Sequence, residues 1–260
     1  MGAVPPDRER AIHRPPRRAL RPGGHPRRAT VPVRELPEDH RDHRPQDVGV
    51  SVAVVTVAVG DEYQAMLPTW ACGVAALERQ PDEVIIAVDD LSGRIINELQ
   101  MILRDFWIVP SDRQWTHHPQ VLINDAIAVS ESEWICKMDA DDLILPHALT
   151  PLDDLDADVL MFGISHGEKD LQYRGVTAEA ILRREANLVF SGSPFRRRLW
   201  ETNPFRDMIY EDWAFWIGCA EQGARFHPSD TIDYIYTIHE GQISARADSA
   251  YWASVVRSLS

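Results

Sequence analysis

Three carboxylates, Asp139, Asp141 and Asp142, directly follow an apolar segment and are the first candidates for chemistry in this sequence. Residues 134–138 are mostly apolar and predict a short buried strand. A buried strand that stops at acids places them at its carboxyl end, where open α/β sheets bind ligands. Carboxylate oxygens suit hard cations such as Mg²⁺ or Mn²⁺, which commonly bridge to substrate phosphates. We therefore predict a site for a metal ion and a diphosphate.

The spacing within this cluster divides its members. Asp139 and Asp141 lie two residues apart, so in an extended chain their side chains point to the same side. One of them could then hold a metal while the other accepts a ribose hydroxyl. The alternative is an ordinary turn at the end of a strand, capped by aspartate.

Two other acid pairs stand at the ends of predicted elements. Asp89 and Asp90 follow a predicted strand, where they could hydrogen-bond a nucleobase or ribose, or form a plain Asx turn. Glu211 and Asp212 open a predicted helix, and the free N–H groups and dipole of a helix start explain one acid without any function. The second acid could act as a general base toward a hydroxyl.

Three further side chains are candidates for substrate or metal contacts. His239 follows an apolar strand and could be a metal ligand, although a single histidine is more often just hydrogen-bonded. Arg246 could pair with a diphosphate in a bidentate manner, or have no specific partner. Trp213 could present a ring face to a sugar, or belong to the core, as helical aromatic stripes usually do.

Strands and helices alternate through the first part of the chain. Predicted strands cover residues 50–59, 83–88, 106–109 and 134–138, with helices at 66–77, 95–103 and 121–129 between them. We expect a helix at 146–155, a strand at 158–164 and a helix at 178–184, then a loop-rich region at 187–203. A helix at 211–222, a strand at 231–238 and a terminal helix from about residue 247 complete the prediction. The alternation indicates a mostly parallel sheet with helices on both faces and convergent strand ends.

Composition narrows the function classes. Residues 1–47 are rich in Arg and Pro, lack apolar periodicity and carry a formal charge of +4, so we predict a disordered extension there. Residues 48–260 carry −17, which argues against nucleic-acid binding. The three cysteines form no CxxC pair, and no apolar run approaches the roughly 20 residues of a membrane span. We expect a cytoplasmic protein without an integral membrane segment.

Taken in order, these motifs resemble the family-two glycosyltransferases of the GT-A fold. The resemblance is carried by EVIIAVDDLSG, WICKMDADDLILP, IYEDWAFWIGCAEQG and YIYTIHEGQIS, and it covers about residues 50–246. It implies one GT-A domain over residues 48–260. It also implies an inverting transfer of a sugar from a nucleotide-diphosphate sugar to an acceptor hydroxyl, with Mn²⁺ or Mg²⁺ as cofactor. The acceptor class, whether glycan, lipid-linked or protein, is left open.

The resemblance also assigns roles. Asp89 or Asp90 would bind the nucleobase, Asp139 the ribose, and Asp141 the metal, with His239 completing the metal or diphosphate site. Thr56 and Arg246 would lie on the donor side and Trp213 on the acceptor side. Asp212, or less readily Glu211, would deprotonate the acceptor hydroxyl.

Two alternatives compete with this interpretation. A catalytically degenerate transferase fold could retain nucleotide-sugar binding alone. A strand followed by Asp-x-Asp also opens the haloacid-dehalogenase-like phosphohydrolases, with the first Asp as nucleophile. The position of this motif behind three earlier strands argues against that class.

Overall fold

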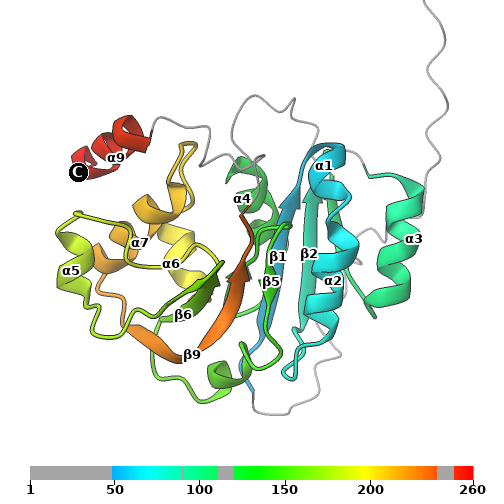
Figure 1. The fold of residues 1–260 in the computed structure, drawn as a ribbon, viewed down its shortest axis with the longest axis horizontal. Helices are drawn as coiled ribbons and strands as arrows, with labels where there is room; N and C mark the ends of the chain where they lie inside the picture. The colour runs from blue at the N-terminus through cyan, green and yellow to red at the C-terminus, as the bar shows by residue number, and fades with distance from the viewer. Residues whose placement is uncertain (1–48, 90, 111–119, 239–248, 260) are drawn as a thin grey trace, which may run out of the picture. The chain divides into compact units, whose positions relative to one another are not determined.

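The computed structural model describes residues 49–89, 91–110, 120–238 and 249–259. These residues build one nine-stranded sheet covered by helices (Figure 1). Its strands are β1 (Val52–Ala58), β2 (Glu83–Val88), β3 (Trp107–Pro110), β4 (Trp134–Lys137), β5 (Leu143–Ile144), β6 (Val159–His166), β7 (Lys169–Leu171), β8 (Phe195–Arg196) and β9 (Phe226–Tyr236). The helices are α1 (Gly60–Gln64), α2 (Leu67–Ala75), α3 (Gly93–Ile102), α4 (Gln120–Val129), the 3₁₀ helix η2 (Thr150–Asp153), α5 (Ala178–Leu182), α6 (Arg197–Thr202), α7 (Glu211–Glu221) and α9 (Ser249–Ser258).

The sheet is mostly parallel, as predicted. Its main strand order is β3-β2-β1-β4-β8-β6-β9-β5, and β7 pairs with the last residues of β6, Ile164 to His166. Strands β1 to β4 run parallel, and β6 and β9 share their direction, because β8 is antiparallel to both β4 and β6. Only β5, β7 and β8 oppose them within the described residues. The carboxyl ends of β1, β4, β6 and β9 therefore point to the same edge.

Side-chain alternation along β1 explains why helices cover both faces. Val52 and Val54 belong to a core with α2 and α3, whereas Ala53 and Val55 belong to a second core with α4 and α7. Each face of a strand has a period of two, so every second residue enters the same core. Figure 1 shows α2 in front of β1 and β2, on the side of the first core.

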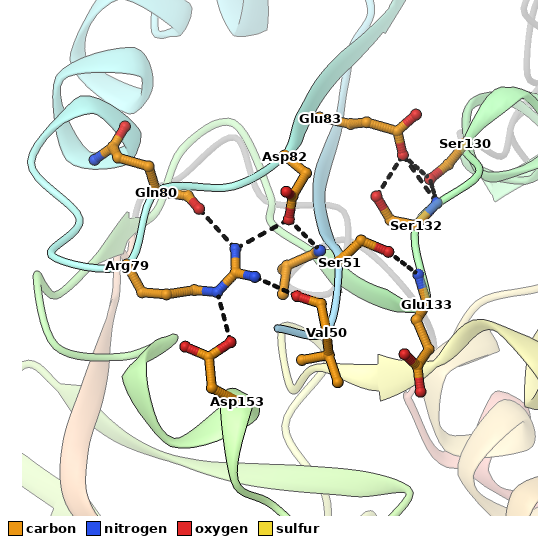
Figure 2. A network of polar contacts seen from close by, with 11 residues as sticks. Val50, Ser51, Arg79, Gln80, Asp82, Glu83, Ser130, Ser132, Glu133 and Asp153 are labelled. Carbon is orange, nitrogen blue, oxygen red and sulfur yellow. Dashed lines mark hydrogen bonds and ion pairs between the residues drawn. The ribbon is translucent and has the colours of Figure 1, made fainter. Parts of the chain in front are cut away.

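Polar contacts tie together the edge where β1, β2 and β4 begin. The Glu83 carboxylate accepts hydrogen bonds from the Ser130 hydroxyl at 2.6 Å and from the Ser132 backbone N–H at 3.0 Å (Figure 2). Arg79, after α2, donates to the Val50 carbonyl and to Asp153 at 3.3 Å. Since all these groups lie away from the carboxyl ends of the strands, this network holds the scaffold rather than the cavity described below.

The region predicted to be loop-rich, residues 187–203, is more ordered than its sequence indicated. It contains β8, which joins β4 to β6, and the helix α6. The Asn124 side chain holds the segment after α6, because its oxygen accepts from Trp200 Nε1 at 2.7 Å and its amide donates to the Phe205 carbonyl at 2.7 Å. These partners come from distant parts of the chain, so local periodicity could not reveal them.

Other predicted elements need smaller corrections. The helix expected at 146–155 is a series of turns around the short η2, where Pro151 removes a backbone donor. The strand expected from 231 begins at Phe226, because it pairs in parallel with β6 along its length. Gly163 lies where the two strands approach most closely: a Cβ there would stand 2.1 Å from the Thr231 carbonyl oxygen.

Some predictions fall outside the described residues: the extension at 1–47, and Asp90, His239 and Arg246. Within the described residues, no helix combines the length and the apolar character needed to cross a membrane.

Candidate active site

A cavity of about 370 Å³ opens at the carboxyl edge of the sheet. Residues at or just after the ends of four parallel strands line it: Val59, Asp139, His166 and Tyr236. Glu211 and Asp212 reach the same cavity from the first turn of α7. Its size falls within the range of about 300–1,000 Å³ typical of ligand pockets.

The structure thus joins two acidic motifs that lie far apart in the sequence. Asp139 and Asp141, predicted as the donor side, and Glu211 and Asp212, predicted as the base side, all line this cavity. A cavity that gathers four carboxylates with an apolar wall is a candidate active site.

Lys137 lies between these two motifs. Its ammonium Nζ is 3.0 Å from Asp139 Oδ1 and 3.5 Å from Glu211 Oε1, and its side chain is only 9% exposed. Burial by itself would lower the pKa of Lys137, but the charges of Asp139, Glu211 and Asp212 outweigh it and raise that pKa above its ordinary value. The lysine is therefore a permanent cation inside an acidic cavity.

Among the acids that line the cavity, Asp212 has the surroundings that best suit a general base. Burial and the neighbouring charge of Glu211 raise the pKa of Asp212 to about 7. Its Oδ2 accepts a hydrogen bond from the Asn187 side-chain amide at 2.8 Å, which fixes the carboxylate. A general base works best when its pKa lies near the operating pH. This environment suits Asp212 for accepting a proton from a substrate hydroxyl.

The backbone before α7 directs these acids. Tyr210 has φ 63° and ψ 35°, a left-handed conformation that costs a non-glycine residue about 1–2 kcal/mol. The turn at Tyr210 leads directly into the first turn of α7, which carries Glu211 and Asp212. Strained residues of this kind concentrate at functional sites.

Asp142 serves the structure around the acid cluster. It is 1% exposed and its Oδ1 accepts from the Thr237 backbone N–H at 2.8 Å, which joins the turn after β4 to the end of β9. Burial raises the pKa of Asp142 to about 8, with further contributions from Asp139 and Asp141. Asp142 therefore holds the turn that carries Asp139 and Asp141.

The carboxylates that line the cavity suit a metal ion whose remaining ligands come from the bound substrate. In the part of the chain that the structure describes, no three His, Cys, Asp or Glu side chains are grouped closely enough to hold a metal ion. Asp141 nevertheless lines the cavity beside Asp139. Mg²⁺-type ions are often held by one or two carboxylates together with substrate phosphates, and such a site needs no cage of protein ligands.

Two predicted contacts do not reach the cavity. Thr56 is fully buried and lies on the face of β1 opposite the cavity-lining Val57, so the geometry does not support a donor contact there. Trp213 is 4% exposed and packs in the second core, with Tyr210 at 6.2 Å between ring centroids. Its ring is therefore not available to a sugar in this structure.

Asp89 has a local role at the end of β2. It is exposed, and its Oδ1 accepts hydrogen bonds from the Gly60 backbone N–H at 3.3 Å and from Gln64 Nε2 at 2.9 Å. These bonds fix the turn after β1, next to the cavity-lining Val59 and Tyr63. Asp89 itself is not among the residues that line the cavity.

Sequence reasoning missed Lys137 and Asn187. A usable signal existed for Lys137, because a charged residue inside an otherwise apolar predicted strand must find a buried partner. Its spacing of two from Asp139 also places both side chains on one side of the strand. Asn187 carries no such signal, since its contact with Asp212 is tertiary.

Comparisons with known proteins agree with this architecture. No protein-family model matches the sequence, and no curated protein matches it. S. aureus TarS 1–349 in complex with UDP-GlcNAc matches with a TM-score of 0.60 at 19% identity, over 76% of this chain and 61% of that one. The mannosyltransferase PcManGT from Pyrobaculum calidifontis, in complex with GDP-Man and Mn²⁺, matches with a TM-score of 0.57 at 16% identity, over 84% and 69%.

This chain has the fold of these two proteins. At such identities the similarity establishes the fold, and it confirms the predicted α/β, GT-A-like class. The chain spans 61% of the TarS fragment that it matches. The ligands of TarS and PcManGT therefore suggest, but do not establish, what this chain binds.

Proposed function

We propose that this protein is a metal-dependent, inverting glycosyltransferase that moves a sugar from a nucleotide-diphosphate sugar to an acceptor hydroxyl. The observation that carries the proposal is the convergence of Asp139 and Asp141 with Glu211 and Asp212 on one cavity, at the carboxyl edge of a mostly parallel sheet. Two solved structures with this fold are complexes with UDP-GlcNAc and with GDP-Man and Mn²⁺. Their ligands support the same donor class for this chain.

Asp212 is the proposed base. In the transfer, the acceptor oxygen forms a bond to the anomeric carbon while the bond from that carbon to the diphosphate oxygen breaks. The hydroxyl proton passes to Asp212, and the electron pair of the broken bond leaves with the nucleoside diphosphate. Attack from the side opposite the leaving group inverts the configuration. Glu211 is less suited to this role because it pairs with Lys137.

The donor side is proposed to use the acids after β4. Asp139 would accept a hydrogen bond from a ribose hydroxyl. The Ser191 hydroxyl already donates to its Oδ2 at 3.4 Å. Asp141, with His239 as a predicted second ligand, would hold Mn²⁺ or Mg²⁺. When bound, that ion would neutralise charge on the departing diphosphate. Asp89 or Asp90 for the nucleobase and Arg246 for the diphosphate remain predictions.

The test is a thermal-shift screen of UDP-, GDP- and dTDP-sugars with and without Mn²⁺, followed by a product assay with the stabilising donor. A ligand that binds only the native state at 100 times its Kd adds about 2.7 kcal/mol of stability, which such a screen detects readily. We expect at least one donor to raise the unfolding temperature when Mn²⁺ is present. We also expect slow release of nucleoside diphosphate without an acceptor.

Two outcomes would separate this proposal from its alternatives. If no donor stabilises the protein with metal present, nucleotide-sugar transfer is ruled out. Stabilisation without any turnover, in the presence of a broad set of hydroxyl acceptors, would instead favour a degenerate binding protein.

A further inference from the structure

Lys137 is a buried cation that touches both halves of the cavity. It is the last residue of β4, and Nζ contacts Asp139 Oδ1 at 3.0 Å and Glu211 Oε1 at 3.5 Å. A buried ammonium is unfavourable unless its charge is compensated, and here carboxylates from two separate motifs compensate it. The side chain is thus a direct link between β4 and the first turn of α7.

The ion pairs of Lys137 distinguish the two acids at the start of α7. Glu211 directs its Oε1 to the lysine and is 12% exposed, so its charge is already partnered. Asp212 has a neutral donor instead, the amide of Asn187 at 2.8 Å. An acid with a permanent ionic partner is a poor proton acceptor, whereas one held by a neutral amide can gain and lose a proton.

Building on the proposed function, we infer that Lys137 is the positioning residue of this site. It fixes Asp139 and Glu211 in a shared ion pair and so leaves Asp212 as the group that takes the proton. A purely structural lysine would stabilise the fold without affecting how the base titrates. The two roles can therefore be separated by experiment.

The charges that face Asp212 determine what should change. The main ones in the described residues are Glu211 on the same helix and Lys137 on β4, while Asn187 is a neutral donor and the Tyr173 hydroxyl is a titratable neighbour. Asp139, Asp141 and His166 line the same cavity. Burial and Glu211 raise the pKa of Asp212, and Lys137 lowers it. Loss of the lysine charge should therefore raise the pKa of Asp212 further.

The experiment compares Lys137→Met with Lys137→Arg and with Lys169→Met as the matched control. Lys137 and Lys169 are the two lysines of the chain, and Lys169 is exposed in β7. The first readout is the titration of the Asp212 carboxyl by ¹³C NMR on aspartate-labelled protein, assigned with Asp212→Asn. The second is the pH profile of kcat/KM with the donor found above.

In Lys137→Met we expect the pKa of Asp212, and the acidic limb of the profile, to rise by about one pH unit. At pH 6 that shift lowers activity about tenfold beyond the wild-type loss. Lys137→Arg should keep the wild-type limb because the cation is retained, and Lys169→Met should be indistinguishable from wild type. An unchanged Asp212 pKa in Lys137→Met would overturn the inference.

A second comparison keeps the test decisive if Lys137→Met does not fold. Glu211→Gln removes the anion first, and the double variant Lys137→Met/Glu211→Gln then removes the cation without leaving Glu211 unpaired. We expect a lower Asp212 pKa in Glu211→Gln and its return toward the wild-type value in the double variant. Equal values in both would overturn the inference.

The NMR titration needs no substrate, so the two hypotheses fail separately. A wild-type protein that neither binds nor turns over any donor refutes the proposed function whatever the titration shows. If the wild type is active but the pKa of Asp212 is the same with and without the Lys137 charge, only the positioning role is refuted.

Discussion

Replacing Asp212 with Asn is the sharpest perturbation of the proposed mechanism. The amide is nearly isosteric, and its oxygen can still accept the hydrogen bond that Asn187 donates at 2.8 Å. What the variant loses is the ability to accept a proton. General-base catalysis contributes typically 10²–10⁴-fold, so we expect kcat to fall by about that factor while donor binding is retained.

The pH dependence gives the prediction a second, independent magnitude. With the pKa of Asp212 raised to about 7, chiefly by burial, the carboxylate is half protonated at neutral pH. About 90% of it is ionised at pH 8 and about 1% at pH 5, so wild-type kcat/KM should fall roughly 90-fold between them. The residual activity of Asp212→Asn should not show this fall at acidic pH.

Stability should move in the opposite direction to activity. The pKa of Asp212 is higher in the folded than in the unfolded state, so ionisation destabilises the fold as the pH rises from about 4 to 7, with the full penalty above 7. Removing the ionisable group should therefore stabilise Asp212→Asn at pH 8, on the order of 1–2 kcal/mol for this partly exposed carboxyl, and not at pH 4.

The assay is the initial rate of nucleoside-diphosphate release from pH 5 to 9, paired with urea unfolding at pH 4 and 8. Asp154→Asn, at an exposed side chain, is the matched control and should change neither quantity. If Asp212→Asn retains activity within about tenfold of wild type, or retains the same acidic limb, Asp212 is not the base.

Three other substitutions test the metal, the scaffold and the sheet. Asp141→Asn should weaken the Mn²⁺-dependent part of donor stabilisation by at least about tenfold, and an unchanged metal-dependent thermal shift would exclude Asp141 as a ligand. Glu83→Ala removes the acceptor of two serine hydroxyls and should lower the free energy of unfolding by about 2–4 kcal/mol, whereas the exposed Glu78→Ala should change it by less than about 0.5 kcal/mol in urea titrations. Gly163→Ala would place a Cβ 2.1 Å from a carbonyl oxygen of β9 and should lower the free energy of unfolding by about 1–3 kcal/mol or more. Gly93→Ala should be nearly neutral, because nothing lies within 4 Å of a Cβ there. Equal unfolding midpoints for these two variants would contradict the close approach of β6 and β9.

The elements with strong local signals were predictable from sequence. The strand at 83–88 has the observed bounds, because an apolar run rich in Val and Ile ends at an Asp pair. The helix α7 ends before Gly223, whose φ of 76° marks the left-handed position after a helix. The parallel direction of the first four strands followed from the strand and helix alternation that the sequence displays.

Residues 187–203 show where local signals are insufficient. The strand β8 has only two residues, and its conformation depends on pairing with β4 and β6. The α6 region is held by Asn124 through bonds across about 80 positions of sequence. Propensity describes neighbours in the chain, so elements made by distant partners remain hidden from it.

The sequence by itself determined which residues carry charge at the ends of regular elements: Asp139 and Asp141 after one strand, and Glu211 and Asp212 at one helix start. It could do so because an apolar segment ends directly before the first pair and another begins directly after the second. Only the tertiary structure decided which of them share a cavity, and that Thr56 and Trp213 do not reach it. The tertiary structure also decided which partner each acid has: Lys137 for Glu211 and Asn187 for Asp212. The charge state of a carboxylate depends on such a cation or amide, and only folding brings these groups together.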